Sequence, residues 1–344
     1  MNIVPQLIYN VAILFLMMIP GVILKKCNMI SDGFGKGLSN LVLYIAQPAL
    51  IFLAYLIDFN KEILINSVYV LIFSVITHTL FSVVALAVFK KAPDAKARML
   101  KFSTIFSNAA FMGIPLISAL LEDAYPGSTL YASIYNITFN LFLWSLGVYI
   151  CNKGKDVNLD GVDDFNEVAK LLPTKNDDEK VKDSSGSILK AILHPVTIAA
   201  IIGLLFFILR ISNYVPKLAI DSLTMLKNLV APLSMVVIGL RLADMSFKGA
   251  FGDKFMYVFL ALRHLALPLL VIFIIKLVTL IGLDIHPAVS TVVVIMSCAP
   301  AATSATMFAE KFDCDSMYVS RLVAISTLIS IVTMPLVIFI FGIL

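Results

Sequence analysis

SNAAFMGIP, residues 107–115, interrupts an apolar stretch that otherwise has the character of a membrane helix. Proline removes a backbone donor and clashes with the preceding turn, so Pro115 should free carbonyl groups on that turn. Irregular backbone is tolerated at membrane depth only where protein or a water-filled cavity satisfies its polar groups. Asn108 carries an amide that can do so, and Gly113 permits the close approach of a second backbone. The stretch therefore indicates a broken membrane helix with a functional reason for its break.

The composition of the whole chain is that of a membrane protein. Of its 344 residues, 60% are hydrophobic and only 14% are charged, whereas a soluble surface needs far more charge. A helix needs roughly 20 residues to cross the hydrocarbon core. Ten apolar runs meet this length within a few residues: 6–24, 38–57, 63–89, 98–121, 128–150, 190–210, 216–243, 255–281, 285–309 and 316–343. We therefore predict an all-α integral membrane protein with ten transmembrane helices.

Basic residues are concentrated in alternate gaps between these runs. One set of gaps holds clusters within residues 25–36, 90–101, 153–190, 241–254 and 311–321. The other set holds only Lys61, Arg210 and Lys217. Short loops rich in Lys and Arg stay in the cytoplasm. We expect a multi-pass protein of the cell (plasma or inner) membrane, with both termini outside.

A long polar segment, residues 151–189, divides the chain into two halves. Five helices precede it, within residues 1–150, and five follow it, within residues 190–344. Because five is odd, the second half must lie upside down relative to the first, as in the inverted repeats of secondary transporters. We predict two five-helix repeats joined by a cytoplasmic linker.

The positions of four prolines support this repeat. Pro48 and Pro115, in helices 2 and 4, are 67 residues apart, and Pro232 and Pro300, in helices 7 and 9, are 68 residues apart. Proline is common in membrane helices, so a chance match is the alternative explanation. If the repeat holds, helices 4 and 9 are equivalent and both are broken.

The break in helix 9 lies in the stretch SCAPAATSAT, which places small and hydroxyl-bearing residues after Pro300. Broken helices at equivalent positions of an inverted repeat are the best pointer in a sequence to a substrate site. We expect the freed amides after each proline to bind the substrate and Asn108 to orient it, although an interhelical hydrogen bond is the alternative role for this asparagine. The candidate substrate-binding residues are Asn108, Gly113, Pro115, Pro300, Ala301, Ala302, Thr303 and Ser304.

The charges near the two breaks favour an anionic substrate. No Asp or Glu lies between Lys101 and Leu121 or between Ile285 and Ala309, whereas an exchanger of protons or sodium needs an ionisable group at this depth. Helix N-termini attract anions, but the C-terminal ends of the first half-helices arrive at the same place, so dipoles alone do not choose a sign. The lack of acidic residues favours a carboxylate.

Four polar residues elsewhere could support this site. Asn136 and Asn140 lie four residues apart on one face of helix 5, where packing is the alternative role. Arg263 and His264 lie deep in helix 8 and need partners there. They could form a charge relay beside the break or pair with a polar group of helix 3 or helix 10.

Other chemistry has little support in the sequence. The four cysteines form no CxxC, so we expect no disulfide, no metal site and no cofactor. The helices contain neither paired aspartates nor an HExxH motif, which argues against an intramembrane protease and against enzymatic activity in general. No filter signature of a channel is present.

Long stretches of the chain resemble one known family of carriers. They include NLVLYIAQPALIF (residues 40–52), SNAAFMGIPLI (107–117), APLSMVVIGLRLA (231–243) and APAATSATMFAEK (299–311). These stretches resemble the auxin efflux carrier family, whose bacterial members are often described as malate or malonate permeases. His194 departs from the pattern, since the family more often has asparagine there, and we expect little consequence at a helix start.

The resemblance implies a fold like that of sodium/proton antiporters and bile-acid symporters. Helices 4 and 9 would cross at their breaks within a transport domain of helices 3–5 and 8–10, and helices 1, 2, 6 and 7 would form a scaffold that dimerises. A small organic anion would move with the transport domain in an elevator motion, with no nucleic acid partner. An ion-coupled symporter of the bile-acid type and a membrane solute sensor that binds without transport are the alternatives.

Overall fold

The structure, a computed structural model, describes residues 3–31, 33–152, 194–243, 252–312 and 314–343. Within these residues the chain is helical, with one isolated β-bridge and no strand. Beyond Asn152, the predicted linker 151–189 lies outside the described residues. The all-helical prediction is therefore confirmed for the part of the chain that can be described.

Seven helices are long and apolar enough to cross a membrane, and three apolar helices are shorter. The long ones are Tyr9–Lys26, Phe34–Tyr55, Lys61–Lys91, Ser128–Cys151, Lys217–Ala243, Lys254–Leu280 and Ser316–Ile343. The shorter ones are Ala109–Leu120, Pro195–Leu209 and Pro287–Cys298. The inverted repeat of ten membrane helices stays a prediction.

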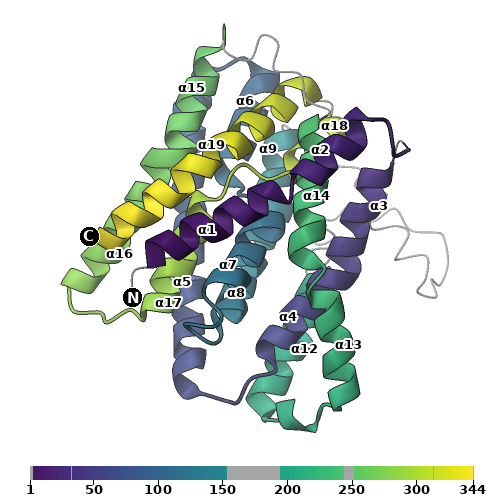
Figure 1. The fold of residues 1–344 in the computed structure, drawn as a ribbon. Coiled ribbons are helices and arrows are strands. Elements are labelled where there is room, and N and C mark those ends of the chain that lie inside the picture. The colour runs from purple at the N-terminus through teal and green to yellow at the C-terminus, as the bar shows by residue number, and fades with distance from the viewer. Residues whose placement is uncertain (1–2, 32, 153–193, 244–251, 313, 344) are drawn as a thin grey trace, which may run out of the picture.

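The apolar runs of the first half each fold into one continuous or interrupted helix (Figure 1). In chain order the elements are α1 (Ile3–Leu16), α2 (Ile19–Lys26), α3 (Phe34–Leu41), η1 (Val42–Ala46), α4 (Gln47–Tyr55), α5 (Lys61–Val88), η2 (Phe89–Lys91), α6 (Asp94–Ile105), η3 (Ala109–Gly113), α7 (Ile114–Leu120), α8 (Ser128–Phe142), η4 (Leu143–Gly147) and α9 (Val148–Asn152).

The second half follows the same rule. Its elements are α12 (Pro195–Leu209), η5 (Ser212–Tyr214), α13 (Lys217–Lys227), α14 (Val230–Ala243), α15 (Lys254–Ala261), η7 (Leu262–Ala266), α16 (Leu267–Leu280), α17 (Pro287–Cys298), α18 (Ser304–Lys311) and α19 (Ser316–Ile343).

Prolines explain three of the irregular turns. The π-helical turns η1, η3 and η7 are each followed by a helix with proline in its second position: Pro48, Pro115 and Pro268. Proline cannot donate the α-helical hydrogen bond and its ring clashes with the carbonyl four residues earlier, so the preceding turn widens. Such bulges inside helices are frequent at functional sites.

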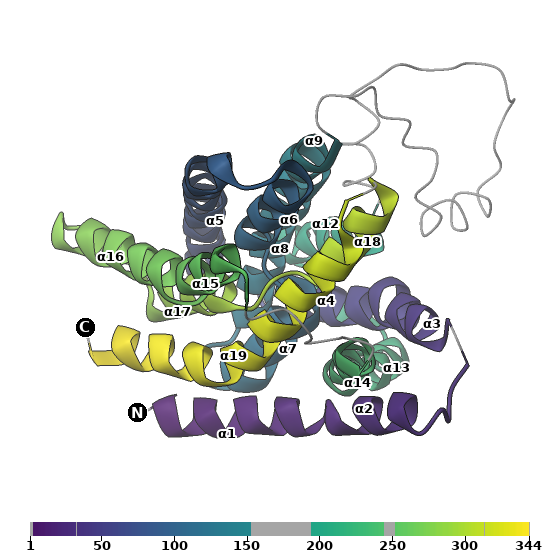
Figure 2. The ribbon, with the colours of Figure 1, turned by 90° about the horizontal axis from the view of Figure 1, so that it is seen from above.

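The helices pack in two groups (Figures 1 and 2). In the first group, α4 packs against α12 and α13, and α14 packs against α2 and α3. In the second group, α5 packs against α6, α8 and α17, and α19 packs against α6, α17 and α18. The helix made of α15, η7 and α16 also belongs to this group, because η7 and α16 pack against α17 and α19. Helix α1 contacts α14 on one side and α7 and α19 on the other, which brings the two chain ends close together (Figure 2).

Two glycines let the backbone of α14 approach that of the interrupted helix formed by α1 and α2 very closely (Figure 2). A Cβ atom on Gly21 would lie 2.3 Å from the carbonyl oxygen of Val236, and one on Gly239 would lie 2.1 Å from that of Met18. Small residues at such contacts are typical of membrane helix pairs, since they allow backbones to meet. The first group is therefore held together by a backbone contact that only glycine permits.

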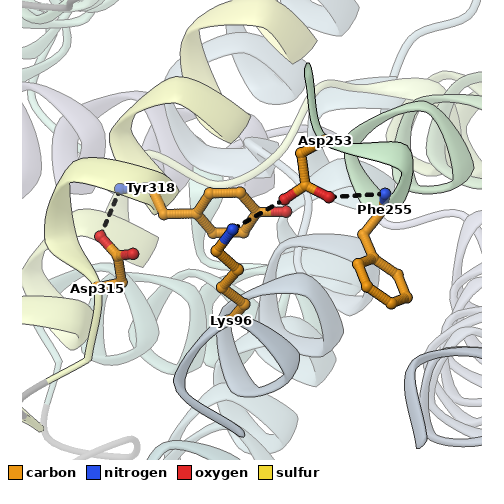
Figure 3. A network of polar contacts seen from close by, with 5 residues as sticks. All are labelled: Lys96, Asp253, Phe255, Asp315 and Tyr318. Atoms are coloured by element: carbon orange, nitrogen blue, oxygen red, sulfur yellow. Dashed lines mark hydrogen bonds and ion pairs between the residues drawn. The ribbon is translucent and has the colours of Figure 1, made fainter. Parts of the chain in front are cut away.

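A polar network joins three helices of the second group at one end (Figure 3). Lys96 of α6 lies 3.2 Å from the carboxylate of Asp253, and its ammonium lies 4.8 Å from the centre of the Tyr318 ring of α19. Asp253 accepts a 2.9 Å hydrogen bond from the amide of Phe255, as the N-cap of α15. Burial works to raise the pKa of Asp253, but the Phe255 amide, Lys96 and Tyr318 outweigh it and hold this pKa below its ordinary value.

Candidate functional site

Two broken helices meet at their breaks. Helix α6 ends at Ile105 and η3 begins at Ala109, while α17 ends at Cys298 and α18 begins at Ser304. Ser107 and Ala301 form the antiparallel β-bridge between the two breaks. The amide of Asn108 donates to the Pro300 oxygen at 2.7 Å, and the amide of Ala302 donates to the Phe106 oxygen at 2.9 Å. Each break thus satisfies backbone groups of the other, which is how irregular backbone persists at membrane depth.

The amides after Pro300 are only partly free. Those of Ala301 and Ala302 are taken, the first by the hydroxyl of Ser326 at 2.9 Å and the second by Phe106. In this structure these two amides are therefore not free for a substrate, and their role in binding stays a prediction. The next two amides, of Thr303 and Ser304, have no hydrogen-bond acceptor among the described residues, as is usual for the first amides of a helix.

Gly113 makes room for a side chain rather than for a second backbone. The nearest atom to a Cβ built on it is the sulfur of Met296, at 2.5 Å, on α17. The sequence correctly indicates close packing at this glycine, but the close contact differs from the one that we expected. Any larger residue here would push Met296 out of its place behind the crossing.

A cavity of about 560 Å³ lies between the two groups of helices. From the first group it is lined by residues of the α2–α3 connection, α3, η1, α4 and α14, and by His194 at the start of α12. From the second group it is lined by residues at the two breaks, α8, η4, α18 and α19. The cavity therefore touches the crossing at one end and both groups along its walls.

The candidate residues divide into those that line this cavity and those that do not. Asn108, Ala302, Thr303 and Ser304 line it, and so do Asn136 and Asn140 of α8. The lining does not include Gly113, Pro115, Pro300, Ala301, Arg263 or His264. The prolines themselves do not line the cavity; its wall at the crossing is formed by residues before Pro115 and by Ala302, Thr303 and Ser304 after Pro300.

Among the described residues, three buried side-chain atoms on the cavity wall lack a hydrogen-bond partner. They are Nδ2 of Asn108, Oδ1 of Asn136 and Oε1 of Gln47, on residues that are 3%, 3% and 0% exposed. A buried polar group without a partner costs about 1–3 kcal/mol. A ligand with both hydrogen-bond acceptors and a donor would relieve this cost.

Gln47 is a cavity residue that sequence reasoning missed. It lies in α4, and its amide nitrogen donates to the carbonyl oxygen of Ala110 in η3, so it links the two groups beside the crossing. The signal was present in the sequence, since Gln47 is a polar residue in an apolar run and stands directly before Pro48. A side chain of this kind at membrane depth is a functional candidate by default.

Arg241 is the second residue that the sequence did not assign to the site. Its position near the end of an apolar run suggested a loop charge, but it lies in α14 and lines the cavity. Its guanidinium donates to the oxygen of Thr303 at 3.0 Å and to the hydroxyl of Thr306 at 3.2 Å. It therefore joins the first group to the start of α18.

Arg263 lies fully buried in η7, behind the crossing. Its Nε donates to the carbonyl oxygen of Ala299 at 3.1 Å, Nη2 donates to the same oxygen, and Nη1 donates to that of Thr104 at 3.1 Å. These carbonyls belong to the ends of the first halves of the two broken helices. The arginine thus holds both half-helices by their C-terminal ends.

His264 is tied to α19. One ring nitrogen lies 2.9 Å from the hydroxyl of Ser326 and the other 3.0 Å from that of Thr333. The hydroxyl of Ser326 in turn accepts a hydrogen bond from the backbone amide of Ala301. The histidine therefore supports the break between α17 and α18 through one intervening hydroxyl group.

His194 caps α12, because its ring nitrogen accepts from the amide of Val196 at 3.3 Å. Asparagine is also a preferred N-cap residue, so the departure from the family pattern keeps the cap.

Among the described residues, no cluster of His, Cys, Asp and Glu could hold a metal ion, and all four cysteines are free.

Comparisons with known proteins agree on the class of the chain. The model of a family described as membrane transport protein matches residues 6–338. The chain is also 21% identical, over 338 residues, to an uncharacterised transporter of Methanocaldococcus jannaschii, a match that covers 95% of this chain and 96% of that protein. A match over almost the full length, joined to the apolar helices, establishes a multi-pass membrane protein. The chain belongs to the membrane transport protein family, that of the auxin efflux carriers.

Proposed function

We propose that the protein is a secondary transporter that moves a small organic anion, of the carboxylate class, by alternating access at the crossing of the two broken helices. One observation carries this proposal: the cavity between the two groups of helices ends on the crossing, where Asn108 has an unpartnered amide nitrogen. Sites of secondary transporters are typically built from such discontinuous helices.

We infer the sign of the substrate's charge from the groups that would contact it in the cavity. The amides of Thr303 and Ser304 begin α18, and helix N-termini favour anions. No Asp or Glu is present among the described residues that line the cavity. Among them a cation would find no counter-charge, whereas a carboxylate would find hydrogen-bond donors.

The two groups of helices would move relative to each other. In this proposal the first group and α1 are the scaffold, and the second group, with both breaks, is the transport domain. Gln47 and Arg241 reach across the boundary to Ala110 and to Thr303 and Thr306, and these bonds would break when the domain moves. Lys25 and Lys36 also line the cavity, and both fall on the predicted cytoplasmic side. We therefore assign the structure to a state that is open to the cytoplasm.

Counterflow in proteoliposomes tests this function. Purified protein is reconstituted in vesicles preloaded with unlabelled lactate, malate or benzoate, and uptake of the same labelled compound is followed. A transporter accumulates label transiently, whereas a sensor binds the compound without moving it. Failure of a broad panel of carboxylates both to bind and to exchange would overturn the proposal. Dependence of net uptake on a sodium or proton gradient would favour the ion-coupled alternative.

The first group also offers a face for a second copy of the chain. Helix α13 has no buried residue, and Leu218 and Met225 on it are 81% and 74% exposed. We propose a homodimer through the scaffold, as the family resemblance implies. Native mass spectrometry in mild lipid-like conditions should give twice the mass of 37.7 kDa, and a monomer there would count against it.

A further inference from the structure

Four helix ends meet at the crossing, and their dipoles nearly cancel. Each helix end carries roughly half an elementary charge, positive at the N-terminus and negative at the C-terminus. The C-terminal ends of α6 and α17 and the N-terminal ends of the helix that starts with η3 and of α18 all arrive there. The dipoles of the four ends therefore sum to about zero, and they do not favour an anion over a cation.

Arg263 removes this balance. Its guanidinium donates to Thr104 in the last turn of α6 and to Ala299 directly after α17, so it occupies both negative ends. It is fully buried, and no Asp or Glu among the described residues pairs with it. Its other contact is the ring of Phe81, whose centre lies 5.4 Å away. The two negative helix ends are thus offset by one full positive charge, and the two positive ends remain.

The remaining charge lies within reach of the cavity. Ala299 accepts from Arg263, and Ala302, three residues further along the chain, lines the cavity. Three residues span at most about 11 Å. The 3.1 Å bond to Ala299 and the contact to a bound ion add to this span, so the guanidinium lies at most about 17 Å from the ion. At this distance, a unit charge in a protein environment with a dielectric constant of about 20 changes the affinity for an ion by about fivefold or more. Arg263 can therefore act on a bound ion without touching it.

We propose that Arg263 is the positioning residue that makes this site select an anion, a role that rests on the transport function proposed above. With Arg263 in place the crossing carries about one net positive charge, which one bound carboxylate would neutralise. Because Arg263 belongs to the second group of helices, this charge moves with the transport domain. The empty domain carries it uncompensated, whereas the domain loaded with a monoanion is neutral.

Paired carboxylates and amides test the proposal. The affinities of lactate, malate and benzoate are measured beside those of their uncharged amides, for the parent and for Arg263→Lys and Arg263→Gln. The parent should prefer each acid to its amide. Arg263→Lys keeps the charge and should keep most of this preference, whereas Arg263→Gln should lower the acid-to-amide ratio by about fivefold or more. Arg210→Gln, at the far end of α12, is the control and should leave the ratio unchanged.

The acid-to-amide ratio separates charge from structure. Loss of the hydrogen bonds to Ala299 and Thr104 would weaken acid and amide alike, and only loss of the charge lowers the ratio. A ratio in Arg263→Gln equal to that of the parent would overturn the proposal while leaving the transport function standing. If no carboxylate binds even to the parent, the transport function fails, and this role fails with it.

The parent protein decides the matter if neither variant folds. Voltage steps applied to the empty reconstituted protein should move charge, because the transport domain carries Arg263 across the membrane. Saturating benzoate should suppress this transient current, and benzamide should not. A transport-competent protein with no such current, or with a current that benzoate leaves unchanged, would refute the role of Arg263.

Discussion

The backbone amide of Asn108 donates to the carbonyl oxygen of Pro300 across 2.7 Å, and this bond joins two breaks that lie far apart in the sequence. The carbonyl oxygen of Asn108 accepts from the amides of Met112 and Gly113. The main chain of Asn108 therefore builds the crossing, while its side chain has an amide nitrogen without a partner. The bonds that join the two breaks are thus made by the main chain of Asn108, so the side chain can be changed without removing them.

Substitution of Asn108 should affect binding more than folding. Asn108→Ala removes one donor to a charged group, a contribution of about 1.5–3 kcal/mol, so the affinity for a carboxylate should fall about tenfold or more. Asn108→Asp is nearly isosteric and adds negative charge where the anion should lie, so it should abolish binding more completely. Carboxylate affinity and thermal unfolding are measured together. An aspartate variant that binds and transports like the parent would show that Asn108 is structural.

Gly239 should tolerate no side chain. A Cβ atom there would lie 2.1 Å from a backbone oxygen of Met18, and backbone cannot yield as a flexible side chain does. Gly239→Ala should lower the free energy of unfolding by about 1–3 kcal/mol through overpacking. Gly37→Ala is the matched control, because nothing lies within 4 Å of its added Cβ and it occupies an exposed site in α3. Equal unfolding temperatures for the two variants would refute the close contact.

Much of the fold could be predicted from local sequence. Hydropathy located the helices, because each run had to satisfy its own backbone in an apolar setting. The breaks at residues 107–115 and 299–303 followed from proline and glycine, which act on the turn beside them. These signals are local, so a single sequence contains them. The repeat of two halves rests on the spacing of prolines and on the resemblance, and it stays a prediction.

The contacts at the site could not be predicted in the same way. A proline indicates that nearby backbone groups lose their helical hydrogen bonds, but it does not indicate which groups become their new partners. At this site the hydroxyl of Ser326, in another helix, accepts the hydrogen bond from the amide of Ala301. The side chain of Gln47 donates a hydrogen bond to Ala110, 63 residues away, and that of Arg241 donates one to Thr303, 62 residues away. Such pairs depend on how helices pack, which hydropathy does not encode.

The carboxylate of Asp253 should make the stability of the folded protein depend on pH. Its folded pKa lies below its ordinary value, so its charge contributes stability that is present above the ordinary pKa of about 3.9 and is lost as the pH falls through the folded value. Asp253→Asn keeps an N-cap and loses the charge, so the parent should unfold at a higher temperature near pH 7 and lose this advantage as the pH falls below about 4. Asp253→Ala loses the cap as well and should cost about 1 kcal/mol. An advantage of the parent over Asp253→Asn that stays constant across this range would exclude the charge as its source.

The orientation of the chain in the membrane can be tested with cysteines. Cys27 is exposed at the end of α2, on the side where basic residues cluster and which we expect to be cytoplasmic. Tyr214, 83% exposed between α12 and α13, lies on the side that is poor in basic residues. An impermeant maleimide applied to intact cells should therefore label a Cys27→Ser/Tyr214→Cys variant but not Cys27 in the parent. Permeabilised cells should allow Cys27 to react, and Cys27→Ser alone, which leaves the buried Cys151 and Cys298 and the partly exposed Cys314, controls for background. The opposite pattern would place both chain ends in the cytoplasm and would turn the cavity at the crossing towards the outside.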